Sequence, residues 1–111
     1  MIIVYKTNHL EALCTDERIA VRKLGARCAK QLWIRVDQLV RSPTLETMRL
    51  VGGDCHELKG NLAGCLAVRI HRGVRLVFQP HHDPVPVKSD GGLDWGAVTC
   101  VCVTSVEDYH D

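Results

Sequence analysis

The residues of this chain that could do chemistry together are histidines, basic side chains and a short acidic and aromatic stretch. His56 and Lys59 precede a glycine, two arginines flank a turn at Gly73, and Asp, Tyr and His follow one another near the C-terminal end. The candidate catalytic residues are His56, Asp108, Tyr109 and His110, and the candidate phosphate-binding residues are Lys59, Arg69 and Arg75.

These residue types match the needs of RNA cleavage without a metal. The reaction needs a base to take the proton of the ribose 2′-hydroxyl, an acid for the leaving 5′-oxygen, and cations to stabilise the charged phosphorane. Histidine suits the first two roles because it titrates near neutrality, and lysine and arginine suit the third. Tyr109 could stack on a base or transfer a proton. The set predicts a site that requires neither a metal nor a cofactor.

Structural roles are open for the same residues. His56 could merely cap the edge of a sheet, and Asp108 could orient a neighbouring histidine or pair with Arg75. Trp33 and Trp95 are expected to pack in the interior rather than to stack on bases.

Length and composition indicate one globular domain, residues 1–111. The chain is 46% hydrophobic and 24% charged, with a net charge of +1, which is typical of a globular protein with a single core. No apolar run reaches the roughly 20 residues of a membrane helix, and the N-terminal stretch lacks the leading positive charge of a signal peptide. We therefore expect a cytoplasmic protein with no membrane partner.

The six cysteines show no CxxC spacing and accompany no export signal. We expect them to be reduced and mostly buried. Charge is uneven along the chain: residues 18–75 hold twelve Lys and Arg against four Asp and Glu, and the residues after Arg75 hold one Lys against six acidic residues. The middle of the chain could bind an anion, or its basic helix face could serve solubility alone.

Helix signals fill the first half of the chain. After a strand at residues 1–6, Asn8 can cap a brief helix to about Cys14, and Asp16 can cap a long helix from about Glu17 to Arg41. At about 100° per residue one side of that helix is apolar. Its members are Leu24, Cys28, Ala29, Leu32, Val36, Leu39 and Val40.

Strand signals fill the second half. Apolar alternation in residues 65–71 and 74–79 predicts a hairpin that pairs Ile70 with Val74 and Arg69 with Arg75 across a three-residue turn. Like charges directly opposite one another cost up to about 1 kcal/mol, so a carboxylate or a bound phosphate should compensate. Residues 80–97 form an insertion, and residues 98–106 a central strand. The order predicts an α+β fold: an N-terminal strand, two helices, then an antiparallel meander with the helices on one face.

In these residues and in the order of its elements, the chain resembles the HigB branch of the RelE/ParE superfamily, the toxins of bacterial type II toxin–antitoxin systems. The resemblance covers nearly the whole chain. The segments that carry it are His56-Glu57-Leu58-Lys59-Gly60-Asn61, Gly64, Val74-Arg75-Leu76-Val77-Phe78, Asp94-Trp95 and Val106-Glu107-Asp108-Tyr109-His110.

The resemblance implies a ribosome-dependent mRNA interferase that cleaves the codon in the 30S A site, where it meets mRNA and rRNA. It implies inhibition by a HigA-type helix-turn-helix antitoxin, with oligomers formed through that antitoxin. By position, His56 matches the family's active-site histidine, and Asp108, Tyr109 and His110 match its C-terminal set. Lys59 and Arg75 match its phosphate-contacting residues, with Arg69 as a secondary candidate.

Two departures from the family pattern matter. Related toxins usually carry a charged Asp-Arg-Lys-Gly turn where this chain has Asn61-Leu62-Ala63-Gly64, so two positive charges are missing where RNA would be gripped. The insertion contains His81-His82-Asp83, which looks like a metal cluster, although adjacent histidines on a loop are usually not one. The alternatives are a toxin-fold module that binds antitoxin or ribosome without cleaving, and a gyrase-directed toxin.

Overall fold

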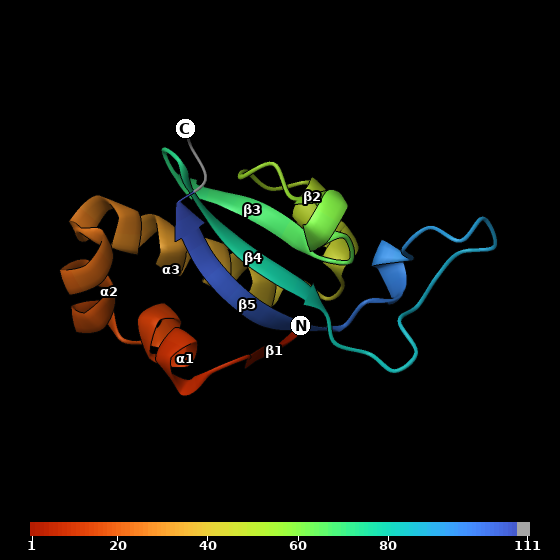
Figure 1. Ribbon diagram of the computed structural model, residues 1–111, viewed down its shortest axis with the longest axis horizontal. Coiled ribbons are helices and arrows are strands. Elements are labelled where there is room, and N and C mark those ends of the chain that lie inside the picture. The colour runs from red at the N-terminus through yellow and green to blue at the C-terminus, as the bar shows by residue number, and fades with distance from the viewer. Residues whose placement is uncertain (109–111) are drawn as a thin grey trace.

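The computed structural model describes residues 1–108, which form an α+β fold (Figure 1). The helices are α1 (Asn8–Thr15), α2 (Glu17–Leu24) and α3 (Ala26–Arg41), and the strands are β1 (Ile2–Tyr5), β2 (His56–Glu57), β3 (Leu66–His71), β4 (Val74–Pro80) and β5 (Cys100–Asp108). Short 3-10 turns occupy Leu45–Arg49 (η1), Gly60–Leu62 (η2) and Trp95–Ala97 (η3). The predicted order of strand, helices and meander is confirmed.

The five strands form one mixed sheet in the order β1-β5-β4-β3-β2. Strands β2 to β5 pair antiparallel, whereas β1 lies parallel to β5, with Ile2 opposite Cys100 and Tyr5 opposite Val103. The parallel edge follows from the chain path, because α1, α2 and α3 intervene between β1 and the meander. The predicted central strand is confirmed as β5, which has a neighbour on each side.

The predicted long helix is wrong, because it is two helices divided at Gly25. Gly25 has φ +84°, its N–H caps α2 through Val21 O, and α3 starts at the next residue. The predicted cap is correct, since the Asp16 carboxylate accepts from the N–H groups of Arg18 and Ile19. For α1 the cap is Thr7 rather than Asn8, because the Thr7 hydroxyl accepts from Leu10 N–H at 3.1 Å.

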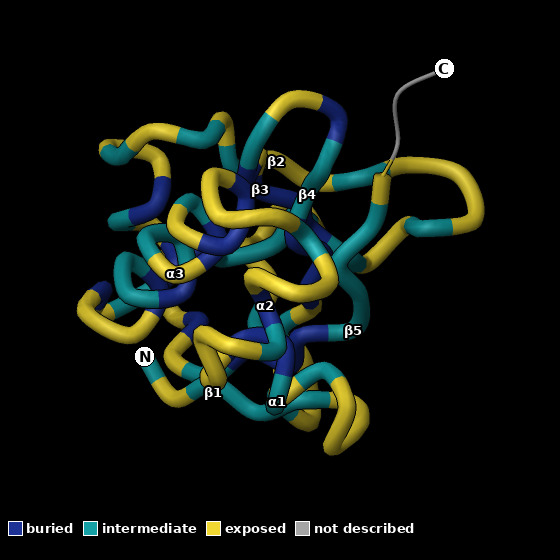
Figure 2. Tube along the Cα trace, turned by 90° about the vertical axis from the view of Figure 1, so that its left-hand side faces the viewer, coloured by how far each residue is buried: buried dark blue, intermediate teal, exposed yellow. Residues whose placement is uncertain are grey.

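The core lies between α3 and one face of the sheet, and Figure 2 shows the buried stretches concentrated there. Of the predicted apolar face, Cys28, Ala29, Leu32, Val36 and Leu39 are buried. Val40 is exposed, and so is Trp33, contrary to its predicted packing role. Trp95 is buried as predicted. None of the helices within residues 1–108 is long and apolar enough to cross a membrane.

The sheet face turned away from α3 is here called the open face (Figure 1). His56 in β2 stands opposite Ala67 in β3, so these two side chains share a face. Side chains alternate between faces along a strand. Leu66, Val68, Leu76 and Phe78 belong to the core against α3, so Ala67 and Val77 between them point to the open face. Both are buried and form its floor.

The segment from Gly52 to Asp54 crosses from the helical layer to the sheet and leads into β2. Gly53 O accepts from Arg69 N at 2.7 Å, and Arg35 Nε on α3 donates to Arg69 O at 2.9 Å. A Cβ at Gly53 would lie 2.5 Å from Val68 Cγ2 and 2.9 Å from Arg35 Nε. Glycine at position 53 therefore permits the close approach that places His56 on the sheet.

We expect Gly53→Ala to lower the free energy of unfolding more than Gly25→Ala. Both glycines have positive φ, where a side chain costs roughly 1–2 kcal/mol. Only at Gly53 does the new methyl also meet the fully buried Val68, which adds roughly 1–3 kcal/mol of overpacking, whereas nothing lies within 4 Å at Gly25. Urea unfolding of both variants measures the difference, and equal losses would contradict it.

Candidate functional site

Strand pairing arranges the open-face side chains in three rows. One row runs Arg69, Arg75, Glu107 across β3, β4 and β5, and the next runs His56, Ala67, Val77, Ser105 from β2. The third holds Cys65, Gln79 and Cys102, with Cys65 Sγ donating to Gln79 Oε1 at 4.0 Å. The structure thus brings His56 into the row beside the paired arginines.

The predicted pairing of Arg69 with Arg75 is confirmed, and each arginine meets a carboxylate. Arg75 Nε and Nη2 donate to Glu107 Oε1 at 2.8 and 2.6 Å, and Arg69 Nη2 lies 3.8 Å from Asp54 Oδ2. These acidic groups supply the compensation that the like-charge pairing required.

The hairpin turn itself differs from the prediction. His71, not Ile70, stands opposite Val74, because the register shifts after Arg69 and the turn shortens to Arg72 and Gly73. Arg72 takes positive φ, +51°, in this tight turn.

His56 is held by the backbone of the residue two positions earlier. Its Nδ1 lies 2.7 Å from Asp54 O. A carbonyl oxygen only accepts, so Nδ1 carries the proton in the neutral ring and Nε2 carries the lone pair. The His56 side chain is 53% exposed. The arrangement suits a base whose Nε2 can reach a substrate proton.

Asp54 is the residue that the sequence reasoning missed. It takes φ +51°, a left-handed conformation that aspartate adopts more readily than most residues. Its carboxylate Oδ2 lies 3.8 Å from both His56 Nδ1 and Arg69 Nη2. The sequence feature that could have identified Asp54 is its place directly after Gly52-Gly53, where a turn precedes the short strand.

Glu57 fixes the other side of β2. Trp95 Nε1 donates to Glu57 Oε2 at 3.1 Å, and the Arg49 guanidinium stacks 3.7 Å from the centre of the Trp95 ring. Cation–π contacts of this kind stabilise by roughly 0.5–2 kcal/mol. The two-residue strand is therefore held by η1 and η3 as well as by β3.

The remaining candidates lie elsewhere or beyond the described residues. Lys59 is exposed just before η2, three residues past His56. Asp108 pairs with Val74 at the end of β5, and alternation directs it to the face opposite that of Glu107. Tyr109 and His110 lie outside the described residues.

The cysteines are free, as predicted, and burial raises the pKa of the Cys14 and Cys55 thiols to about 12. These two remain protonated at neutral pH and are poor nucleophiles. Residues 1–108 contain no group of three His, Cys, Asp or Glu side chains able to hold a metal ion. In the insertion, His82 Nε2 accepts from Thr99 N and Cys100 N, so it ties the loop to β5.

No protein-family model matches this chain. No curated protein sequence matches it either. Several solved structures do. The YoeB/ParE toxin from Agrobacterium tumefaciens shares 17% identity at a TM-score of 0.57, covering 99% of this chain and 100% of that one. A YoeB dimer and a YoeB–YefM complex from Staphylococcus aureus each share 20% identity at a TM-score of 0.55, covering 100% of this chain and 98% of theirs.

These similarities establish the fold. The chain has the α+β fold of these YoeB/ParE toxins. The similarities show the fold alone, so membership of the RelE/ParE superfamily and of its HigB branch stays a proposal.

We expect neutral His56 to be the Nδ1–H tautomer, because Asp54 O can only accept its proton. Long-range 1H–15N spectra recorded at alkaline pH distinguish the two ring nitrogens. His82 is the internal reference, since its Nε2 accepts from two backbone N–H groups and so requires the same tautomer. A protonated Nε2 in His56 would contradict the assignment.

Proposed function

We propose that this protein is a HigB-type toxin: a ribosome-dependent mRNA interferase that cleaves mRNA in the 30S A site by metal-independent acid–base catalysis. The observation that carries the proposal is His56, fixed through Nδ1 by Asp54 O on the face that carries Arg69 and Arg75. The likeness of the fold to YoeB/ParE toxins supports the toxin class.

In this mechanism His56 and His110 divide the acid and base duties. One takes the 2′-hydroxyl proton as the 2′-oxygen attacks phosphorus, and the other protonates the departing 5′-oxygen. The products are a 2′,3′-cyclic phosphate and a 5′-hydroxyl. Tyr109 positions a base, and Asp108, which alternation directs to the face opposite that of Glu107, orients the neighbouring histidine. The exposed His56 side chain, held through Nδ1, supports its part in this scheme.

The basic residues stabilise the phosphorane. Arg75 and Arg69 stand side by side on adjacent strands, so one phosphate can meet both guanidinium groups. Lys59 contacts the phosphate backbone of the RNA from the turn that follows β2. Because Arg75 and Arg69 already face Glu107 and Asp54, an incoming phosphate must replace a carboxylate as their partner.

The partners are the ribosome, its bound mRNA and an antitoxin. One similar structure is a heterotetrameric YoeB–YefM toxin–antitoxin complex, which supports an antitoxin for this chain too. We propose a HigA-type helix-turn-helix antitoxin, oligomers formed through it, a cytoplasmic site of action, and a single toxin domain over residues 1–111.

A non-cleaving toxin-fold module is the second candidate. The observation that favours it is the Arg75–Glu107 pair, in which the Arg75 side chain is only 17% exposed. A paired cation attracts phosphate less strongly, and residues 61–63 offer no charge in compensation. Cleavage assays separate this module from the enzyme.

His56→Ala and His110→Ala should each abolish cleavage, because each removes one proton-transfer group. Primer extension on a defined mRNA, in a purified translation reaction with and without ribosomes, maps the cuts to the A-site codon. His9→Ala on α1 is the matched control and should cleave as the wild type does. A 5′-phosphate product or a metal requirement would refute the mechanism, and wild-type inactivity would favour the non-cleaving module.

Glu107→Gln should increase cleavage or RNA affinity severalfold, because the amide still accepts from Arg75 but no longer neutralises it. Asp37→Asn is the charge-matched control, since Asp37 forms an exposed ion pair with Arg41 on α3. Affinity for ribosome-bound mRNA, measured against salt concentration, separates the local effect from net charge. Equal gains in both variants would argue against phosphate binding at Arg75.

A further inference from the structure

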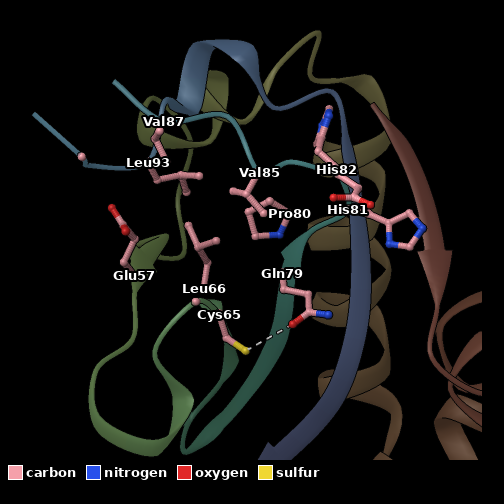
Figure 3. A pocket seen from close by; sticks show the side chains of 13 residues that line it. Glu57, Cys65, Leu66, Gln79, Pro80, His81, His82, Val85, Val87 and Leu93 are labelled. Carbon is pink, nitrogen blue, oxygen red and sulfur yellow. Dashed lines mark hydrogen bonds between the residues drawn. The ribbon is translucent and has the colours of Figure 1, made fainter. Parts of the chain in front are cut away.

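A pocket of about 630 Å³ lies at the end of the sheet, between the start of β3, the end of β4 and residues 81–93 (Figure 3). Its walls are mostly apolar: Leu66, Pro80, Val85, Val87 and Leu93. Glu57 and Gln79 add polar groups on different sides, and Figure 3 shows Gln79 directed toward Cys65. Apolar walls with a few placed polar groups are typical of small-ligand sites.

The pocket meets the open face on one side. Cys65 and Gln79 line it and also form an open-face row, whereas Glu57, which stands opposite the core residue Leu66, lines it from the other side of β2. Strand spacing places Gln79 about 12 Å from His56, two strands across and one row along. This is a distance of one or two nucleotides along an extended RNA strand.

The charges at the pocket favour a base over a phosphate. Glu57 and Asp83 line it beside His81 and His82, and the two carboxylates would repel a phosphate, which the arginine row attracts. The Glu57 carboxylate has one oxygen bonded to Trp95 Nε1, which fixes the orientation of the group. A carboxylate accepts hydrogen bonds from the amino group of adenine, cytosine or guanine, whereas uracil offers carbonyl oxygens in that position.

We propose that this pocket binds a nucleobase of the mRNA, one or two nucleotides from the cleaved bond, and that Glu57 selects an amino-bearing base over uracil. The amide N–H groups of Gln79, which take no part in the contact with Cys65, donate to the acceptors of the base. Pro80, Val85 and Leu93 cover its faces. The insertion that closes the pocket thus contributes to codon preference. This inference rests on the proposed function.

The Trp95 indole N–H is a built-in reporter, because it donates to Glu57 inside the site. We would titrate 15N-labelled protein with 2′-O-methyl oligoribonucleotides, which lack the nucleophile and stay intact. Adenine-containing oligonucleotides should shift the Trp95 indole resonance, while that of Trp33, identified with Trp33→Phe, should stay in place. Oligouridylate should bind roughly tenfold more weakly.

Glu57→Gln keeps an acceptor for Trp95 but removes the charge, so it should abolish the preference over uracil while leaving the thermal unfolding midpoint unchanged. Glu17→Gln on α2 makes the same change outside the pocket and should keep the preference. Val85→Trp fills the pocket and should abolish the Trp95 shift. Assayed for cleavage across a codon set, Glu57→Gln and Val85→Trp should flatten the codon profile at one position, whereas Glu17→Gln should leave it unchanged.

The outcomes separate this inference from the proposed function. A Trp95 shift in a protein that does not cleave RNA would support base binding in the pocket and contradict the proposed nuclease activity. Cleavage without any shift of the Trp95 resonance would contradict base binding in the pocket and support the nuclease activity. An unchanged codon profile in Glu57→Gln would do the same. Adenosine monophosphate binding as tightly as the oligonucleotide would overturn the assignment to RNA, because the neighbouring phosphates would then contribute nothing.

Discussion

The register between β3 and β4 is the constraint on which the open face depends. Side chains alternate with a period of two, so a slip of one residue would exchange the faces. Leu66, Val68 and Phe78 would then leave the core, a loss large enough to make the register unambiguous. The same hydrophobic constraint, together with the tight turn at Arg72 and Gly73, places Arg69 opposite Arg75. The candidate cation site is thus a consequence of how the core is buried.

The two-residue strand β2 cannot hold His56 in place through its ladder alone. Its position comes from three separate segments: Gly53 O bonded to Arg69 N, Asp54 O facing His56 Nδ1, and Trp95 Nε1 bonded to Glu57. Trp95 lies 39 residues beyond His56 in sequence, near the end of the insertion. The insertion therefore delivers a supporting contact as well as a wall of the pocket, which explains how a long connection can matter for a site at the opposite edge of the sheet.

Local patterns in the sequence were sufficient where one interaction dominates. The alternation of apolar and polar residues predicted β3 and β4 because one face of each strand is buried. The pairing of Arg69 with Arg75 was predicted from the same pattern. The prediction from apolar periodicity failed at Gly25. The apolar stripe continues through this residue, so periodicity predicted one helix, but Gly25 takes positive φ and divides it into two. Contacts between distant segments, such as β1 with β5 and Trp95 with Glu57, leave no local pattern at all.

The charges of the open face are arranged in pairs, and this bears on how it would meet RNA. Arg75 faces Glu107 and Arg69 faces Asp54, so a free RNA strand gains less from each phosphate contact there than it would at unpaired arginines, since the contact must displace an internal carboxylate. An RNA already held by a larger particle loses less entropy on binding, and the exchange of partners then becomes favourable. We infer that the paired charges favour presented over free RNA. Under the proposed function, internal neutralisation would favour RNA presented by the ribosome, without any contact between these residues and the ribosome itself.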